Sequence, residues 1–210
     1  MKIDRLILGA YETNCYILRS NEATKDCLIV DTGLGAGKLI KFLEEHKLNP
    51  AAVVLTHGHI DHIAGVAALR SRFPDIKVYI HKLDAGMLAE PRTNLSAMTV
   101  GSFSIEPADF SVEEQSCIEQ AGLKLNVLHT PGHTPGGICL YSKDEGIVFT
   151  DDALFADSIG RTDFPSGSIE QLLKSIMEKL FTLPDETKVY PGHGPITTIA
   201  HEKAHNPFFK

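Results

Sequence analysis

The 210-residue chain lacks several features that mark particular classes of protein. No window approaches the roughly 20 consecutive apolar residues that a helix needs to cross a bilayer. The opening residues Met1–Asp4 do not form a signal peptide. Basic side chains are too few for a nucleic-acid surface, because 20 Lys and Arg stand against 27 Asp and Glu, a net charge of −7. We therefore expect a cytoplasmic protein that binds neither membranes nor nucleic acid.

The chain also lacks a disulfide framework. Its four cysteines have no paired spacing, and three of them lie in apolar runs that resemble strands. We expect Cys15, Cys27, Cys117 and Cys139 to be buried thiols in a reducing compartment. None of them neighbours a histidine cluster, which argues against thiolate ligands to a metal.

No linker divides the chain. It contains no Gly/Ser-rich or Pro-rich run, no repeat of fixed period and no low-complexity segment. Its length fits one domain that buries roughly 70% of its unfolded surface. The apolar share of 43% and the charged share of 22% are ordinary for a globular protein. We therefore treat residues 1–210 as a single domain.

What the chain does contain is an alternation of strand and helix patterns. The apolar periodicity predicts strands at 3–8, 14–19, 26–31, 51–55, 77–81, 124–129, 137–141, 146–150 and 188–190. Helices are expected at 38–46, from about 64 to 73, and from a capping box at Ser168 to about 181. Between 90 and 122 the periodicity fades into a loop-rich segment. Two rounds of strands with intervening helices predict an α/β protein with two sheets.

A dense group of possible metal ligands follows the apolar run 51–55. Three histidines and one aspartate lie within the six positions 57–62. The run before them is typical of a buried strand, and open α/β sheets bind ligands at the carboxyl ends of their strands. Buried imidazoles and carboxylates need partners for their lone pairs, so this density rarely serves packing alone. The segment predicts a metal site.

The spacing inside this group allows one ion or two. In an extended segment His57 and His59 point to the same side and can hold one ion. Asp61 and His62 lie near the start of the next expected helix. From there they either reach a second ion or complete the coordination of the first.

Four further polar residues share one context, because each follows an apolar strand and lies in a turn marked by glycine, proline or a second acid. They are Asp31, His133, Asp152 and His193. A single Asp or His in such a place is usually a turn or capping residue. Glycines beside the two histidines allow the backbone to approach a ligand closely. Because the context recurs at four strand ends, we interpret the four residues as parts of one site.

The order of these residues resembles the full motif set of the metallo-β-lactamase fold superfamily. The set is an aspartate at 31, His-x-His-x-Asp-His at 57–62, and then His133, Asp152 and His193. It covers nearly the whole chain and is highly specific. The resemblance implies a four-layer αββα sandwich, in which two mixed sheets are flanked by helices and the site lies at one edge.

The resemblance also implies a role for each residue. Two sets of three residues would each hold one metal ion, namely His57, His59 and His133 for the first, and Asp61, His62 and His193 for the second. Asp152 would bridge the two ions through its carboxylate oxygens. Asp31 would steady the ligand loop by hydrogen bonds without binding a metal.

The residues of three motifs point to one group within this superfamily. The runs 130–137, 152–155 and 160–163 are similar to those of glyoxalase II (hydroxyacylglutathione hydrolase) and its short bacterial relatives. The tail 194–209 also resembles the short proteins. Longer glyoxalase II enzymes carry a C-terminal helical domain that contacts glutathione, and we expect no such domain here.

Several positions near the expected substrate differ from the longer enzymes. Arg161 stands where they place a basic residue against a glutathione carboxylate. Asp163 and Pro195 fall where they have tyrosines that contact glutathione, and Asp151 replaces the usual glycine before the bridging aspartate. These departures concern the thiol carrier and leave the implied metal ligands intact.

Taken together, these residues predict a binuclear metallohydrolase. Imidazoles and carboxylates suit two divalent ions, zinc first and iron or manganese as alternatives, and seven ligands over two ions leave positions for water. A bound cation lowers the pKa of water to about 7, so hydroxide can attack a small-molecule thioester such as S-lactoylglutathione. Asp61 is assigned a second role, orienting this nucleophile. Arg161 is assigned to bind a substrate carboxylate.

Other functions fit parts of the same pattern. The run Gly160–Phe164 also resembles persulfide dioxygenases, which would use one iron held by His57, His133 and Asp152. A lactonase or another esterase would use the same hydroxide on a different acyl group, and a β-lactamase is disfavoured by the missing export signal. A non-enzymatic binding module would need a metal ion whose coordination shell is filled by protein ligands. The sequence does not determine the oligomeric state.

Overall fold

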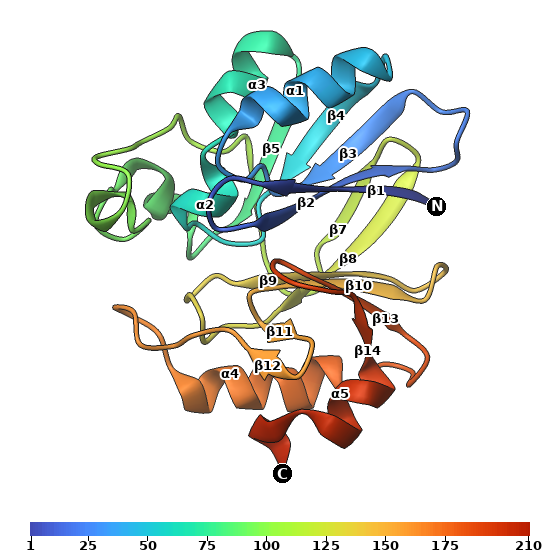
Figure 1. The fold of residues 1–210 in the computed structure, drawn as a ribbon, viewed down its shortest axis with the longest axis vertical. Coiled ribbons are helices and arrows are strands. Elements are labelled where there is room, and N and C mark those ends of the chain that lie inside the picture. The colour runs from blue at the N-terminus through green and yellow to red at the C-terminus, as the bar shows by residue number, and fades with distance from the viewer. The chain divides into compact units, whose positions relative to one another are not determined.

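The computed structural model describes residues 1–210, and the chain divides into two compact units. The first unit comprises residues 1–112 and 118–124, and the second comprises residues 113–117 and 125–210. Each unit contains a sheet that combines parallel and antiparallel strands, with helices over it (Figure 1). The predicted α/β class with two mixed sheets is thereby confirmed. That residues 1–210 act as one domain stays a prediction.

The first unit is built on a six-stranded sheet in the order β1-β2-β3-β4-β5-β6. The strands are β1 (Lys2–Leu8), β2 (Thr13–Arg19), β3 (Asp26–Val30), β4 (Asn49–Val54), β5 (Lys77–His81) and β6 (Phe110–Val112). The first three run antiparallel, and those from β3 to β6 run parallel. The parallel part therefore presents the carboxyl ends of β3, β4 and β5 at one edge of this sheet.

Helices cover one face of this first sheet (Figure 1). They are α1 (Ala36–Glu45) and α3 (Val66–Arg72), with the short α2 (Ile60–Ile63) just before α3. Leu39 and Leu43 of α1 and Leu69 of α3 are fully buried, in one core cluster with Ile29 and Val53 of the sheet. The amphipathic patterns that predicted these helices thus correspond to the faces that they bury.

The segment between 90 and 122 is less irregular than the sequence predicted. It contains the 3₁₀ turn η2 (Ser96–Met98), which follows η1 (Ala85–Ala89), and it also contains β6 and β7 (Cys117–Gln120). These elements have only three or four residues each, too few to produce a recognisable period. β6 pairs with β5, and the ring of Phe110 stacks on the ring of Tyr79 at 4.8 Å between centroids.

The second unit has its own sheet, in which the strands follow the order β14-β13-β10-β9-β8. The bounds are β8 (Leu123–His129), β9 (Ile138–Ser142), β10 (Ile147–Asp151), β13 (Lys188–Pro191) and β14 (Thr197–Thr198). A small hairpin, β11 (Leu154–Phe155) and β12 (Ser158–Ile159), was not foreseen from the sequence. β9 and β10 form the predicted antiparallel hairpin, and β10 runs parallel to β13.

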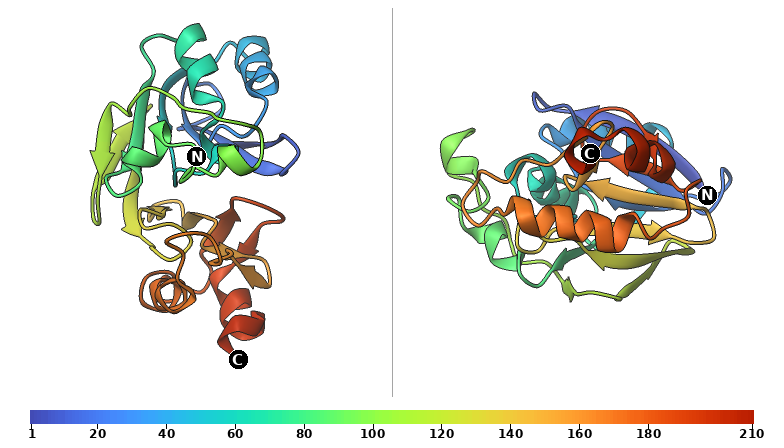
Figure 2. Two further views of the ribbon diagram at one scale, coloured as in Figure 1. Left: turned by 90° about the vertical axis from the view of Figure 1, so that its left-hand side faces the viewer. Right: turned by 90° about the horizontal axis from the view of Figure 1, so that it is seen from below.

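Two helices lie over one face of the second sheet and appear in front of it when viewed from below (Figure 2, right). α4 (Ile169–Ser175) continues into the π-helical turn η3 (Ile176–Leu180), and α5 (Ile199–His205) is followed by the 3₁₀ turn η4 (Pro207–Phe209). The Ser168 hydroxyl accepts a hydrogen bond from the Gln171 amide at 3.3 Å, so the predicted N-terminal cap is confirmed. Ile176 and Ile199 share a core cluster with Val148 of the sheet.

The cysteines depart from the sequence prediction at one position. Cys15, Cys27 and Cys139 are buried, but Cys117 is exposed. It opens β7, a short strand in which exposed and buried side chains alternate, so its side chain lies on the solvent face. Burial raises the pKa of the Cys27 and Cys139 thiols to about 12, which keeps them protonated.

No helix of the structure combines the length and the apolar character needed to span a membrane.

Candidate metal centre

The loop after β4 carries the dense ligand group, and its backbone path depends on a glycine. A Cβ atom on Gly58 would lie 2.6 Å from the Met87 Cβ, which real Cβ atoms do not tolerate. The Gly58 amide donates to the buried Asp84 carboxylate at 3.2 Å. The peptide between His57 and His59 is therefore held from the η1 side by one hydrogen bond and one close contact.

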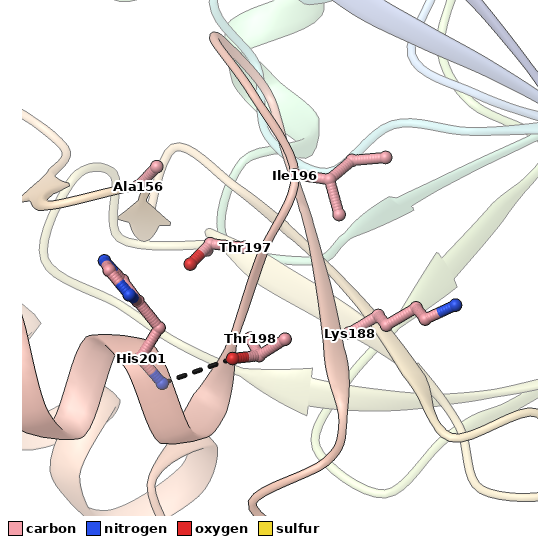
Figure 3. A pocket seen from close by; sticks show the side chains of 6 residues that line it. All are labelled: Ala156, Lys188, Ile196, Thr197, Thr198 and His201. Carbon is pink, nitrogen blue, oxygen red and sulfur yellow. Dashed lines mark hydrogen bonds between the residues drawn. The ribbon is translucent and has the colours of Figure 1, made fainter.

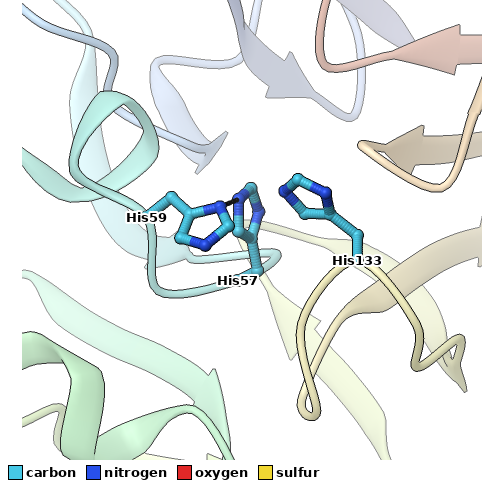
Figure 4. A group of neighbouring side chains, drawn as sticks. All are labelled: His57, His59 and His133. Atoms are coloured by element: carbon cyan, nitrogen blue, oxygen red, sulfur yellow. Dashed lines mark hydrogen bonds between the residues drawn. The ribbon is translucent and has the colours of Figure 1, made fainter. Parts of the chain in front are cut away.

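His57 and His59 turn their ring nitrogens toward each other. Their Nε2 and Nδ1 atoms are 2.9 Å apart, marked by the dashed line in Figure 4. The same figure draws His133, which comes from the loop after β8 in the second unit. Two imidazole nitrogens this close supply a pair of donors for one cation of the zinc class. The structure thus brings together the two residues that the sequence assigned to one ion.

His62 lies between two carboxylates of the first unit. Its Nδ1 is 3.1 Å from Asp31 Oδ2, and its Nε2 is 3.2 Å from Asp61 Oδ2. The Asp61 carboxylate also accepts a hydrogen bond from the Thr13 hydroxyl at 3.2 Å. A histidine that donates Nδ1–H to a carboxylate keeps Nε2 as an acceptor, the state that a metal ligand requires.

Asp31 has the contacts of a residue that supports the loop. Its two carboxylate oxygens accept the Thr56 amide at 2.9 Å and the Thr56 hydroxyl at 2.8 Å. It therefore ties the first residue of the ligand loop to His62, six positions further along. Its backbone has φ 55°, which aspartate tolerates better than most residues. These contacts fit the predicted supporting role.

The second unit brings three of the predicted ligands together. Asp152 Oδ2 is 3.5 Å from His133 Nε2, and Asp152 Oδ1 is 3.5 Å from His193 Nε2. Asp152 follows β10, and His193 follows β13, its parallel neighbour in the sheet. Each oxygen of one carboxylate thus faces a different imidazole. This is the arrangement of donors that a carboxylate bridging two cations needs.

The orientation of His133 is set by the loop that follows β12. Its Nδ1 donates to the backbone carbonyl of Arg161 at 2.7 Å, so Nε2 is left as the acceptor facing Asp152. The loop approaches Asp152 so closely that a Cβ on Gly160 would lie 1.8 Å from the Asp152 carbonyl oxygen. Only glycine fits at that position.

The backbone conformation of Asp151, the residue before the predicted bridging aspartate, restricts which residues can occupy this position. Asp151 has φ 47°, in the left-handed region that glycine adopts most easily. Longer enzymes of the resembling group have glycine there, and aspartate is among the few residues that replace it at low cost. The Asp151 carbonyl accepts the Gly192 amide at 3.1 Å, which links the turns after β10 and β13.

Sequence reasoning missed Asp84 and Thr13, which contact the ligand loop of the first unit. Asp84 lies just after β5, the strand next to β4, and is fully buried. Its place at a strand end is the signal that singled out Asp31 and Asp152, and the same rule would have found it. Thr13 opens β2, and nothing in its sequence context indicates that its hydroxyl reaches Asp61.

The predicted substrate-binding residue is already engaged. The Arg161 guanidinium forms two hydrogen bonds with the Asp163 carboxylate, both 2.9 Å, and lies over the Phe164 ring at 4.1 Å from its centroid. The pair raises the pKa of Arg161 and lowers the pKa of Asp163. Its role toward a substrate stays a prediction.

The second unit also has a cavity of about 420 Å³ away from the predicted ligands (Figure 3). The residues that line it are Ala156, Lys188, Ile196, Thr197, Thr198 and His201. His201 pairs with Asp157 at 2.8 Å and lies next to the buried Glu202. The Glu202 carboxylate accepts the Asp157 amide at 3.0 Å and the Asn206 side chain at 2.8 Å, which ties α5 to the β11–β12 hairpin. We therefore keep this group outside the site.

Comparisons with known proteins agree with this geometry. The family model of the metallo-β-lactamase superfamily matches residues 8–193. A probable metallo-hydrolase of Bacillus subtilis, YqgX, is 40% identical over 99% of this chain and 97% of its own length. The hydroxyacylglutathione hydrolase GloC of Haemophilus influenzae is 35% identical over 99% of this chain and 98% of its own.

Solved structures show the same likeness. The BLEG-1 B3 metallo-β-lactamase has a TM-score of 0.94 and 39% identity, with all of both chains covered. TTHA1623 in a di-iron-bound form has a TM-score of 0.84 and 35% identity, over 98% of this chain and 99% of that one. ETHE1 from Myxococcus xanthus has a TM-score of 0.81 and 33% identity, over 99% and 84%. The chain, with the fold and the His and Asp motifs just described, belongs to the metallo-β-lactamase superfamily.

Proposed function

We propose that this chain is a metal-dependent hydrolase of the glyoxalase II type that cleaves a thioester such as S-lactoylglutathione. The observation that carries the proposal is Asp152, whose two oxygens face the imidazoles of His133 and His193. Relatives that match this chain over nearly its full length are called a probable metallo-hydrolase and a hydroxyacylglutathione hydrolase. They support hydrolysis in general and a glutathione thioester in particular.

In this proposal two divalent ions are bound, zinc in the first instance and iron or manganese as alternatives. The ligands are the seven donors His57, His59, Asp61, His62, His133, Asp152 and His193. The donor chemistry fits, because imidazole nitrogens and carboxylate oxygens without a thiolate suit these metals in catalytic sites. The di-iron form of TTHA1623 keeps iron among the candidates.

Ions bound there would act as Lewis acids and lower the pKa of a coordinated water to about 7. Side chains and one backbone carbonyl of the chain would orient the water and the metal ligands. Asp61, whose carboxylate is held by the Thr13 hydroxyl, orients the attacking water toward the thioester carbonyl. Asp31 and the Arg161 carbonyl each hold the Nδ1 side of a histidine, so that the Nε2 atoms of His62 and His133 stay acceptors.

Arg161 binds the substrate in this proposal. Its planar fork matches a carboxylate, and the thiol carrier glutathione has two of them. The backbone carbonyl of the same residue accepts the hydrogen bond that orients His133. A carboxylate at Arg161 would therefore hold the acyl group at a set distance from that histidine.

Replacing Asp152 tests the proposal. Wild-type protein should contain about two ions per chain by elemental analysis and should release free thiol from S-lactoylglutathione. Asp152→Ala should lose metal and at least about 100-fold of the rate, because it removes the donor between two histidines. Asp144→Ala, an exposed aspartate in the β9–β10 turn, serves as the control and should change neither. Thiol release at the no-enzyme background by metal-loaded wild type would refute the thioesterase proposal.

A persulfide dioxygenase is the second candidate. The run Gly160–Phe164 resembles those enzymes, and the 33% identity with ETHE1 covers almost all of this chain. That activity would need one iron, held by His57, His133 and Asp152. Oxygen consumption with glutathione persulfide and one iron per chain would favour it over the hydrolase. A lactone and a β-lactam belong in the same substrate panel.

A further inference from the structure

Asp163 occupies Arg161 in the way that a substrate carboxylate would. The guanidinium Nε donates to Oδ1 and Nη2 donates to Oδ2, each at 2.9 Å. Two parallel N–H···O bonds are the geometry with which arginine binds a free carboxylate. The Arg161 guanidinium, which we assign to a substrate carboxylate, thus already binds the carboxylate of Asp163 in the same loop.

The pair lies close to a predicted metal ligand of the same unit. The Arg161 guanidinium stacks on the Phe164 ring, and this ring and the His133 imidazole form a T-shaped pair with 6.2 Å between centroids. The Arg161 carbonyl oxygen accepts the His133 Nδ1–H. Guanidinium, phenyl ring and imidazole therefore follow one another in contact. A ligand that takes the fork from Asp163 would lie beside the reaction centre of the proposed hydrolase.

The pair can be opened by a competing anion. Its side chains are 63% and 68% exposed, so water and solutes reach both partners. Exposed ion pairs contribute little free energy, and a bidentate Arg–carboxylate pair lies at the upper end of their range. The Phe164 ring supports the guanidinium from one side, so Arg161 has a platform that does not depend on Asp163.

We propose that Asp163 is an internal competitor for the carboxylate subsite at Arg161 and sets the affinity for carboxylate-bearing thiol carriers. The kinetic form of this inference rests on the proposed function, and its binding form does not. Carriers with a carboxylate must displace Asp163, whereas neutral carriers do not meet this competition. Asp163 thereby weakens the preference for glutathione-like carriers over neutral ones.

Binding of a non-hydrolysable ligand tests the inference directly. S-methylglutathione is titrated into metal-loaded wild type and Asp163→Asn by calorimetry, and its dimethyl ester serves as the ligand without free carboxylates. Removing the competitor should lower the Kd for S-methylglutathione by about two- to fivefold, the range that an exposed ion pair represents. The Kd for the diester should not change.

Asp185→Asn is the matched control. Asp185 lies in the same unit, is 67% exposed and pairs with Lys203 at 2.6 Å, so its loss changes the net charge by the same amount. It should leave both Kd values unchanged. In an Arg161→Ala background the effect of Asp163→Asn should disappear, because the two residues act on one interaction. Thermal unfolding of each variant checks that the fold is kept.

Kinetics give the second readout. For S-lactoylglutathione, Asp163→Asn should lower KM by the same two- to fivefold factor, and the effect should fall on KM rather than on kcat. Equal affinity of wild type and Asp163→Asn, a similar gain with the diester or with Asp185→Asn, or no binding to Asp163→Asn would each overturn the inference. Tighter binding without turnover of any thioester would uphold it and remove the proposed function instead.

Discussion

At the scale of single residues, the loop after β4 requires a residue without a side chain between His57 and His59, and Gly58 meets this requirement. The space that a Cβ would need there is taken by Met87, and the amide is held by Asp84. These contacts determine where the peptide between His57 and His59 lies. The ring nitrogens of the two histidines, 2.9 Å apart, meet on either side of this fixed residue.

Gly58→Ala should therefore cost about 1–3 kcal/mol of unfolding free energy, because a methyl group is forced into occupied space. Combining it with Met87→Gly should cost less than the sum of the two single changes, since the second change removes Cβ, Sδ and Cε, the three atoms nearest to the added methyl group. Gly86→Ala is the control, because no atom lies within 4 Å of its Cβ. Urea unfolding measures all four. A strictly additive double variant would contradict the steric explanation.

At the scale of elements, strand direction gathers the polar residues. Asp31, the 57–62 group and Asp84 follow β3, β4 and β5, which are parallel neighbours in the first sheet. In the second unit Asp152 and His193 follow β10 and β13, which are also parallel neighbours. Parallel strands bring their carboxyl ends to one edge, so residues far apart in the sequence become close.

Another aspartate of the first unit gives a prediction about pH. Asp109 precedes the edge strand β6, and its Oδ2 accepts the Val78 amide at 2.8 Å and the Arg70 guanidinium at 3.0 Å. Burial raises the pKa of this carboxyl, but the two hydrogen bonds and the Arg70 charge outweigh burial and lower it. The folded pKa is the lower one, so the carboxylate stabilises the fold above its unfolded pKa of about 3.9.

This stabilisation should be lost as the pH falls through the folded pKa. Asp109→Asn should reduce the unfolding free energy at pH 7 by at most about 1 kcal/mol, because the ion pair is partly exposed. Wild type and variant should converge once the pH lies below the folded pKa of Asp109. Denaturant unfolding across this range checks the convergence, with the exposed Asp75→Asn as control. A constant difference down to acid would show that the charge is not the cause.

At the scale of the whole molecule, each unit contributes its own part of the predicted donor set. The first unit holds His57, His59, Asp61 and His62, and the second holds the remaining three ligands. Neither part alone supplies the seven donors of the proposed binuclear site. If that proposal holds, bound ions require the native arrangement of the entire chain and should stabilise it against unfolding.

Removing metal should therefore lower the Tm. A ligand at about 100 times its Kd stabilises by about 2.7 kcal/mol, which in a chain of this size corresponds to roughly 5–10 °C. Calorimetry before and after dialysis against a chelator, and again after zinc is restored, measures this shift. Asp152→Ala should show a much smaller change on the same treatment. An unchanged Tm in metal-depleted wild type would mean that the donors do not hold ions.

The sequence predicted most of the architecture correctly, and its assignment of metal ligands stays a prediction. Apolar periods located the long strands and the helices α1, α3 and α4, and the Ser168 cap was recognised from the capping-box pattern of residues 168–171. The short strands β6, β7, β11, β12 and β14 were missed, because two to four residues do not form a period. Helix α5 was missed as well, because its seven residues include only one large apolar side chain, Ile199. The burial predicted for Cys117 was wrong for a related reason, since the face of so short a strand is not apparent from its sequence.

The sequence by itself determined the types of side chain at the candidate site and their positions at strand ends, because both are properties of local runs of residues. Only the tertiary structure decided which side chains support the donors. Thr13 reaches Asp61 across 48 positions, and the Arg161 carbonyl reaches His133 across 28. Such hydrogen bonds depend on where distant backbones lie, and pairing of the Arg161 fork with Asp163 depends on a loop path. Contacts between such distant positions are not encoded in a local pattern.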